Sequence, residues 1–273
     1  MKKLSLFFVC IFVVTCRTFG AGEQQVAGSR GLAMGSATVA ISDFWSVFNN
    51  PAGISWGKGI KAGFSFENRY LLKELSYKII GLTLPLKAGT LGIVASQYGY
   101  SNYSEMKAGL SFSRKFGKYF SAAVQLDYFR IQIAESYGNK NLLSFEIGLL
   151  YKANRNISFG LHLLNPVPVK VSAHPAEHLP LTVRLGIAYT FSDAFVAILE
   201  AEKDLINKPI IKAGAEYHFA KSFSARIGIS TNPTIFTFGF GLEFGRFCLD
   251  FASGYHPVLG FTPSGSLIFS FQK

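Results

Sequence analysis

The chain has 273 residues and a formal net charge of +11 at pH 7, and 15% of its residues are aromatic while only 16% are charged. This charged fraction is below the roughly 25% that is typical of soluble domains, which argues against a soluble protein. Beyond the N-terminus, no segment has the run of roughly 18 apolar residues that a membrane-spanning helix needs, so a helical membrane protein is excluded.

The first twenty residues are typical of a secretory signal peptide. Lys2 and Lys3 form its positive start, residues 4–14 are apolar, and residues 18–20 offer a cleavage site. A lipidated Cys16 is the alternative, but the stretch before it lacks the small residue that usually precedes such a cysteine. Cleavage would leave Cys248 as the single thiol, so no intramolecular disulfide is expected. An exported, aromatic-rich and helix-poor chain indicates the outer membrane of a Gram-negative bacterium.

Residues 21–59 lack a strand pattern and are predicted to form a periplasmic segment with a short helix. Ser42 is placed to cap a helix over residues 43–48, with Asp43 favoured in its first turn by the helix dipole. Pro51 would end this helix, because the residue before a proline avoids the helical conformation.

From residue 60 to the end, fourteen segments read as strands. The clearest is 234–244, where Phe236, Phe238 and Phe240 alternate with Thr and Gly and so share one face. The second, third, fifth and ninth strands carry apolar residues on both faces, which predicts either bulges or contact with something in the lumen. The expected strands are 60–67, 75–85, 90–98, 105–113, 120–132, 143–151, 157–164, 181–191, 195–202, 210–219, 223–230, 234–244, 247–255 and 266–272.

The connections between these strands alternate between short and long, which is typical of outer-membrane barrels with short periplasmic turns. We therefore predict an all-β fold: a transmembrane antiparallel β-barrel of about 14 strands over residues 60–273, multi-pass, with both termini in the periplasm. A β-sandwich is the alternative, but its strands would need polar outer faces. Aromatic residues of the periplasmic rim are expected to form an interfacial girdle in the outer-membrane lipid: Tyr119, Phe120, Tyr151, Phe191, Tyr217, Phe219, Phe244, Phe247 and Phe271.

The opposite strand face is expected to line the lumen with charges of both signs. If the turn near residue 221 is tight, Glu216 and Arg226 stand directly across from each other. The interpretation favoured here is mutual neutralisation in a wet lumen, and a selectivity ring is the alternative. Cys248 also points inward and has no expected role. The predicted lining is Lys61, Lys107, Glu146, His162, Arg184, Glu200, Lys212, Glu216, Arg226, Glu243 and Asp250.

The run Ala27-Gly-Ser-Arg-Gly-Leu-Ala-Met-Gly-Ser-Ala-Thr-Val-Ala-Ile-Ser-Asp43, followed by Asn50-Pro-Ala-Gly-Ile54, resembles the N-terminal signature of two related groups of outer-membrane proteins. These are the FadL-like fatty acid transporters and the PorV-type proteins. In that superfamily the segment folds as a hatch inside a 14-stranded barrel, which implies that residues 21–59 plug the lumen here. The implied hatch and gate residues are Arg30, Gly31, Met34, Gly35, Asp43, Asn50, Pro51 and Gly53, with residues 31–50 as the gate and Pro51 and Gly53 as its hinge.

Two functions remain open from the sequence. The first is a plugged channel or transporter for small solutes, hydrophobic ones included. The second, implied by the PorV resemblance, is an interaction protein that serves type IX secretion or surface attachment. The longest external connection, residues 165–180, is short and proline-rich, unlike the loops that carry a capture groove in the fatty acid transporters.

Enzymatic and nucleic-acid-binding functions are not expected. His174, Glu177 and His178 lack the helical spacing of a metal site because Pro175 interrupts them. No catalytic residue, metal or cofactor is therefore predicted. The basic residues gather at the predicted periplasmic turns, where lipid headgroups or a periplasmic partner explain them better than nucleic acid does.

Overall fold

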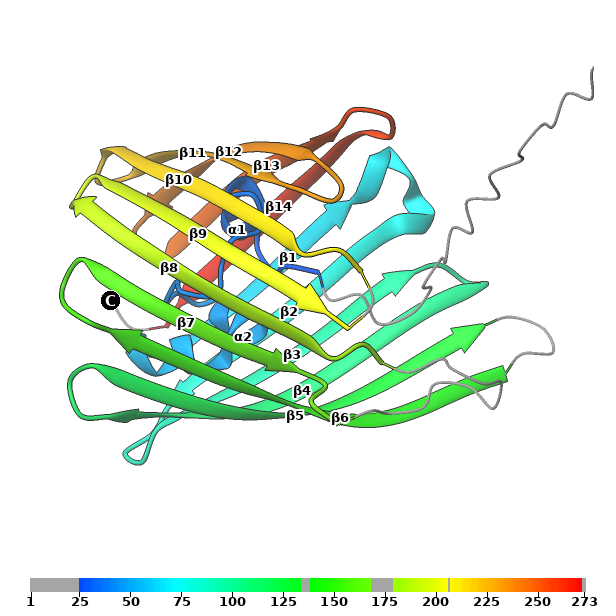
Figure 1. Cartoon of the computed structure of the whole chain (residues 1–273), viewed down its shortest axis with the longest axis horizontal. Coiled ribbons are helices and arrows are strands. Elements are labelled where there is room, and N and C mark those ends of the chain that lie inside the picture. The colour runs from blue at the N-terminus through cyan, green and yellow to red at the C-terminus, as the bar shows by residue number, and fades with distance from the viewer. Residues whose placement is uncertain (1–24, 134–137, 168–178, 206, 272–273) are drawn as a thin grey trace, which may run out of the picture.

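The computed structural model describes residues 25–133, 138–167, 179–205 and 207–271. The predicted signal peptide and the His174–His178 stretch lie outside this part. Fourteen antiparallel strands form a closed barrel in which each strand pairs with its sequence neighbours, and β1 closes the wall against β14 (Figure 1). The predicted 14-stranded barrel is therefore confirmed.

The strands follow the expected order with small shifts in their bounds. They are β1 (Lys61–Asn68), β2 (Ser76–Pro85), β3 (Thr90–Gly99), β4 (Tyr103–Phe116), β5 (Phe120–Ile133), β6 (Gly138–Lys152), β7 (Ile157–Leu164), β8 (Thr182–Ser192), β9 (Phe195–Asp204), β10 (Ile210–Ala220), β11 (Phe223–Ser230), β12 (Ile235–Phe244), β13 (Phe247–His256) and β14 (Gly260–Ser270). Two short 3-10 helices, η2 (Arg69–Leu71) and η3 (Lys73–Leu75), connect β1 to β2.

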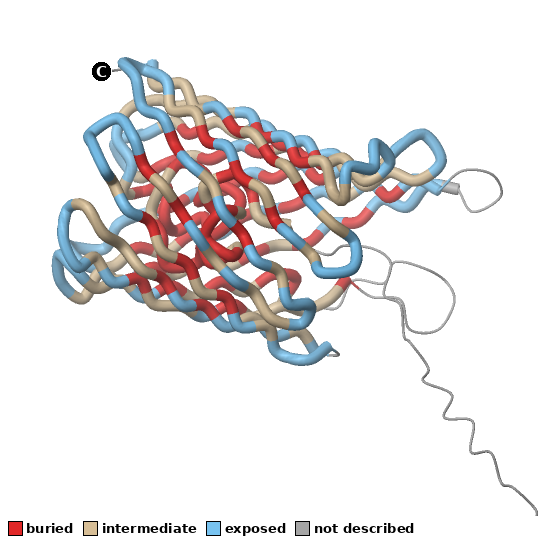
Figure 2. The backbone as a smooth tube through the Cα atoms, turned by 90° about the horizontal axis from the view of Figure 1, so that it is seen from above, coloured by how far each residue is buried: buried red, intermediate tan, exposed pale blue. Residues whose placement is uncertain are grey.

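The polarity of the wall is inverted relative to a soluble protein. On β12, Phe236 and Phe238 are each 51% exposed on the outside, whereas Thr237 between them is 5% exposed. Charged groups such as Glu146 and Glu200 are buried inside, and the buried residues gather in the middle of the barrel (Figure 2). Among the described residues, no helix is long and apolar enough to cross a membrane. An apolar exterior around a polar interior is the arrangement of a barrel in lipid.

The aromatic girdle lies where the sequence predicted it, at the end of the barrel that carries the short turns. Here the rings of neighbouring strands touch: Phe191 is 5.2 Å from Phe195, and Phe244 is 5.7 Å from Phe247, between ring centres. The end of β14 and the C-terminal end of the described chain lie at this same end (Figure 1). We call it the short-turn end and the opposite one the long-loop end.

Two predictions about the wall need correction. β14 begins at Gly260 rather than at residue 266, so the expected long connection over 256–265 is a turn of residues 257–259. Pro263 weakens the strand signal of the sequence. The pairing of β14 with β1 ends at Ser264, opposite Glu67, so Pro263 has a strand neighbour on the β13 side only. A proline is tolerated at such a free strand edge. Likewise β6 begins at Gly138, earlier than expected.

Bulges do not explain the apolar inner residues of the second, third and fifth strands. Those strands pair in continuous register, and the register shifts fall instead at Thr190/Ser192 of β8 and His218/Ala220 of β10. The alternative, contact with something in the lumen, is correct. Ile79 and Val94 pack in one cluster with Phe48 of the N-terminal segment. The ninth strand, β9, pairs with β10 in continuous register, and its Ile198 packs in another cluster with Met34 of the same segment.

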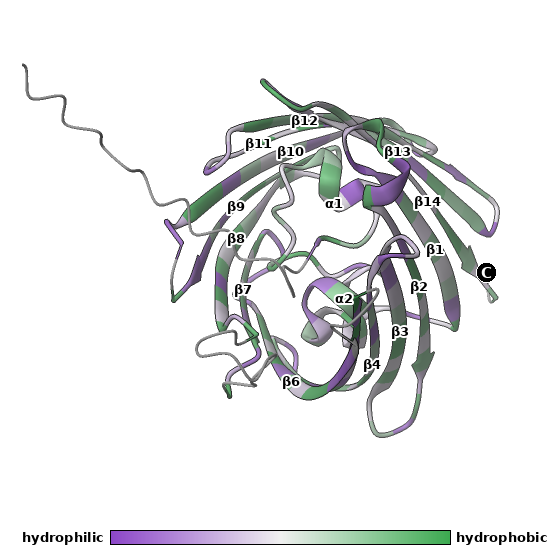
Figure 3. Ribbon diagram, turned by 90° about the vertical axis from the view of Figure 1, so that its right-hand side faces the viewer, coloured by the Kyte–Doolittle hydropathy of each residue, from purple (hydrophilic) through white to green (hydrophobic). Residues whose placement is uncertain are grey.

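The N-terminal segment, residues 25–59, lies inside the barrel and is called the hatch (Figure 3). It contains α1 (Ser29–Ala33), α2 (Ser46–Asn49) and the 3-10 helix η1 (Pro51–Trp56). The predicted helix over residues 43–48 is therefore shorter than expected, and α1 was not predicted. A series of turns over residues 34–45 joins α1 to α2, and Asn50 alone separates α2 from η1.

Ser42 does not cap α2 as predicted. Asp43 and Ser46 instead bond to each other in the turn that leads into α2: the Ser46 N–H donates to Asp43 Oδ1 at 3.0 Å, and the Asp43 N–H donates to Ser46 Oγ at 3.1 Å. This reciprocal pair is the logic of a capping box. Asn50, before Pro51, has an extended backbone (φ −161°), so the predicted end of the helix is confirmed.

Candidate functional site: the hatch and the lumen wall

An ion-pair network joins α1 to three strands near the short-turn end. Arg30 donates from Nη2 to Glu216 Oε1 at 2.7 Å and from Nε to Oε2 at 2.8 Å, and its Nη1 reaches Asp43 Oδ2 at 3.1 Å. Glu216 also pairs with Arg226, directly across from it on β11 as predicted, and Arg226 pairs with Asp250 at 2.6 Å. Burial lowers the pKa of Arg30, but the Glu216 and Asp43 carboxylates raise it by more than burial lowers it, so the pKa lies well above its ordinary value. The guanidinium therefore stays charged.

A second network holds the segment of the hatch between α1 and α2. Glu200 Oε2, on β9, accepts the backbone N–H groups of Thr38 at 2.7 Å and Val39 at 2.8 Å. Its Oε1 accepts from Arg184 at 2.8 Å and from Lys212 at 3.2 Å. Arg184 in turn donates to the hatch, to the Thr38 hydroxyl at 2.8 Å. A buried carboxylate with this many donors is fully compensated.

A third network lies under α2. Lys107 Nζ is 2.5 Å from Glu146 Oε1 and 3.5 Å from Asp127 Oδ1, and Glu146 Oε2 is 2.9 Å from His162. The same ammonium lies 4.7 Å from the centre of the Phe48 ring, a cation–π contact with the hatch. Charges of both signs thus meet in all three networks, which agrees with the interpretation of mutual neutralisation.

The hatch approaches the wall so closely that inward glycines are required. A Cβ on Gly214 or Gly228 would collide with Met34 or Gly35, and one on Gly160 would collide with the Val39 carbonyl. Gly35 itself has φ +67°, a conformation that favours glycine. The hatch backbone therefore packs directly against the inward glycines of the wall.

The C-terminal part of the hatch is fixed by amide and hydroxyl groups. Asn50 Nδ2 donates to the carbonyls of Val39 at 2.7 Å and Leu149 at 3.2 Å. The Ala52 carbonyl accepts from Ser113 at 3.2 Å and Ser121 at 2.9 Å. These bonds connect η1 to β4, β5 and β6.

No protein-family model and no curated protein matches the sequence. Many solved structures are similar to this chain, among them the following three. A FadL homologue from Pseudomonas aeruginosa has a TM-score of 0.71 at 10% identity, over 89% of this chain and 98% of that one. The toluene transporters TbuX of Ralstonia pickettii and TodX of P. putida each have a TM-score of 0.67, at 11% and 12% identity, over 90% of this chain and 98% and 99% of theirs. The barrel has the FadL-type fold.

Within this FadL-type barrel, the predicted hatch residues all lie in the lumen. Gly31, Met34, Gly35, Asn50, Pro51 and Gly53 are buried, and Arg30 and Asp43 are half-buried. The Gly53 Cα faces Ser46 so closely that a side chain would collide with it, which gives this glycine a packing role. Roles in gating, and Pro51 and Gly53 as a hinge, remain predictions.

The predicted lumen lining is brought into the three networks with two exceptions. Glu243 is exposed, and Lys61 is half-buried; both border a cavity of about 340 Å³ at the short-turn end, together with Arg30, Asp43 and Cys248. Sequence reasoning missed several residues that join the hatch to the wall, and strand parity could have signalled only the two wall serines, Ser113 and Ser121. The missed residues are Thr38, Asn49, Trp56, Ser113 and Ser121.

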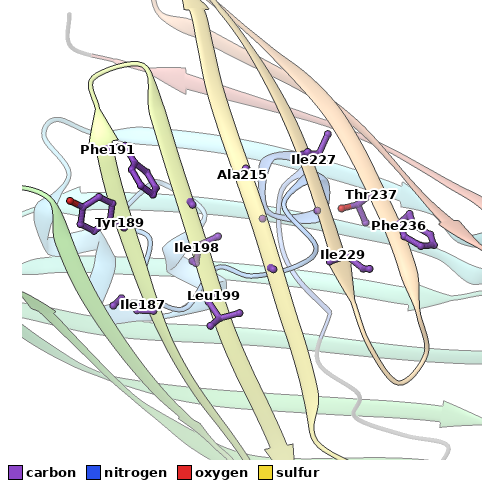
Figure 4. A pocket seen from close by; sticks show the side chains of 14 residues that line it. Ile187, Tyr189, Phe191, Ile198, Leu199, Ala215, Ile227, Ile229, Phe236 and Thr237 are labelled. Atoms are coloured by element: carbon purple, nitrogen blue, oxygen red, sulfur yellow. The ribbon is translucent and has the colours of Figure 1, made fainter.

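A larger apolar hollow lies in the wall over β8–β12. It has a volume of about 740 Å³ and is bordered by outward residues such as Tyr189, Leu199 and Ile227 (Figure 4). Gly214 and Gly228 belong to its lining, and Met34 and Gly35 lie behind them. The glycines that line this outer hollow of the FadL-type wall are therefore the same ones that contact the hatch backbone on their inner side.

Proposed function

We propose that the protein is an outer-membrane channel for small hydrophobic solutes, with the hatch as its gate. The observation that carries this proposal is a hatch held in the lumen by separable polar contacts, inside a barrel whose fold matches proteins described as toluene transporters. A lumen that is filled by a segment of the chain needs displacement of that segment before a solute passes.

The inner wall nearer the long-loop end supports a hydrophobic solute. Ile131, Leu142 and Leu179 form a buried apolar cluster there, and Tyr103 and Phe129 pack against it. Apolar side chains that face the lumen offer a passing hydrocarbon contacts that water does not.

The alternative roles receive less support. The similar structures named above are described as transporters or as a transporter-family homologue, which points away from catalysis and gives the PorV-type secretion role no support. We further propose that the short-turn end, where the described chain ends, faces the periplasm, and that both termini lie in the periplasm.

Transport can be tested in vesicles whose outer leaflet is lipopolysaccharide, which slows passive entry of hydrocarbons. We expect the full mature protein to accelerate uptake of a fluorescent monoaromatic solute, and removal of residues 21–50 to raise ion conductance. A heat-modifiable band on gels would show that both proteins are folded. Uptake equal to that of protein-free vesicles would refute the channel.

A further inference from the structure

Two lysine ammonium groups lie over the indole of Trp56, the last residue of η1. Lys115 Nζ, from β4, is 4.6 Å from the ring centre, and Lys152 Nζ, from β6, is 4.3 Å from it. The ring is itself fixed, because its Nε1–H donates to Ser121 Oγ at 2.8 Å. The hatch and the wall thus hold two positive charges around one aromatic ring.

No carboxylate neutralises these two lysines among the described residues. Lys152 Nζ donates instead to the hydroxyl of Ser42 at 2.8 Å, and Lys115 is exposed to solvent. Two like charges at close range repel each other, so an anion that contacts both is favoured. Phosphate fits this need, because lysine binds it as a point charge and it has several acceptor oxygens.

A cavity of about 280 Å³ opens beside the ring. Ser42 and Trp56 belong to its walls, and so do two further lysines, Lys58 and Lys61. One carboxylate, that of Asp43, also borders the cavity, but it is already paired with Arg30 at 3.1 Å. The cavity therefore has an excess of positive charge. Lys115 and Lys152 are not part of its lining and adjoin it through Trp56, which both of them contact.

The neighbouring turns strengthen the positive field. Residues 86–89, 114–119 and 152–156 form the short-turn end of β2–β7, and they contain no acidic residue. Like charges that line a concave site raise the local concentration of an anion. The basic residues of these turns are Lys87, Arg114, Lys115, Lys118, Lys152 and Arg155.

We propose that Lys115 and Lys152, beside Trp56 at the seam between hatch and barrel, bind a phosphate group, with Lys58 and Lys61 of the adjoining cavity adding to the positive charge. The bound phosphate neutralises both lysines, and through Ser42 and Trp56 it ties the hatch to β4 and β6. The phosphate is carried either by a periplasmic solute or by a phospholipid headgroup at the rim.

Thermal unfolding of the full mature protein in detergent tests the site, with inorganic phosphate compared with chloride at equal ionic strength. A ligand that binds the folded state raises Tm in a saturable way. We expect such a rise for the wild type, its loss in Lys115→Gln/Lys152→Gln, and its retention in Lys115→Arg/Lys152→Arg. The matched control is Lys73→Gln/Lys78→Gln at the long-loop end, where the rise should persist.

Native mass spectrometry distinguishes the two sources of phosphate, with phosphatidylglycerol and phosphatidylcholine as probes. Retention of phosphatidylglycerol by the wild type and not by the double Gln variant supports a lipid site, even if inorganic phosphate does not raise Tm. If the double variant fails to fold, Lys115→Gln alone should weaken binding severalfold, because Lys115 is exposed. Absence of both responses, or responses unchanged by these substitutions, would overturn the proposal, and neither outcome bears on hydrocarbon uptake.

Discussion

Arg30 of the hatch and Glu216 of the wall form a two-point ion pair, with Nη2 to Oε1 at 2.7 Å and Nε to Oε2 at 2.8 Å. The side chain of Glu216 is 1% exposed. The same carboxylate also accepts from Arg226, so it keeps one cation if Arg30 is removed. Attachment of the hatch can therefore be weakened here without leaving a bare charge in the wall.

Arg30→Gln should loosen α1 while the barrel stays folded. Loss of a charged hydrogen-bond partner costs about 2 kcal/mol, because two charge-assisted bonds to Glu216 are replaced by at most a neutral one. Backbone amides of residues 29–35 should then exchange hydrogen about 30-fold faster. Arg246→Gln, which alters an exposed arginine at the same end, is the control. Equal exchange in both variants would show that this ion pair does not hold the hatch.

Glu200→Gln should release the segment of the hatch between α1 and α2. The substitution weakens the acceptor of the Thr38 and Val39 N–H groups, and Arg184 keeps only the more distant Glu202 at 3.5 Å. We expect a loss of about 2 kcal/mol in unfolding free energy and a higher ion conductance in planar bilayers. Glu243→Gln is the matched control, since Glu243 is exposed at the mouth. A conductance change of equal size in the control would contradict the assignment.

The wall could be predicted from the sequence because its signal is local. A period of 2 fixes which residues face lipid, and a tight hairpin fixes which residues are opposite, as for Glu216 and Arg226. The inward side of Gly239 and Gly241 was also readable from parity. Even there, Pro263 hid the first half of β14, because a proline ordinarily argues against a strand.

The path of the hatch could not be predicted, because its contacts are distant in sequence and irregular in shape. Arg30 and Glu216 are 186 residues apart, and no periodicity connects them. Helices as short as α1 and α2 have almost no intrinsic signal, since they are stabilised by packing rather than propensity. The resemblance of residues 27–54 placed the hatch in the lumen, but only the structure shows which wall residue each part meets.

Gly228→Ala should displace the hatch by overpacking. The added methyl group would collide with the backbone of Met34 and Gly35, neither of which is a flexible side-chain end. Such overpacking costs about 1–3 kcal/mol. Gly254→Ala is the matched control, because a Cβ there meets its nearest neighbour, Ile235, at an ordinary 3.4 Å. Denaturation in lipid vesicles measures the unfolding free energy of both variants. Equal values would show that the hatch backbone shifts to accommodate the methyl group without loss of stability.

The lipid-facing exterior predicts a depth-dependent penalty for charge on β12. Phe238 lies well inside the strand and is 51% exposed, whereas Phe244 lies at its short-turn end and is 54% exposed. Arginine near the middle of the bilayer costs about 2–4 kcal/mol, and near the interface about 0–1 kcal/mol, because its charge reaches water there. We therefore expect Phe238→Arg to lower the unfolding free energy in vesicles far more than Phe244→Arg does. Similar losses at the two positions, which remove rings of equal size and comparable exposure, would mean that this face does not lie against hydrocarbon.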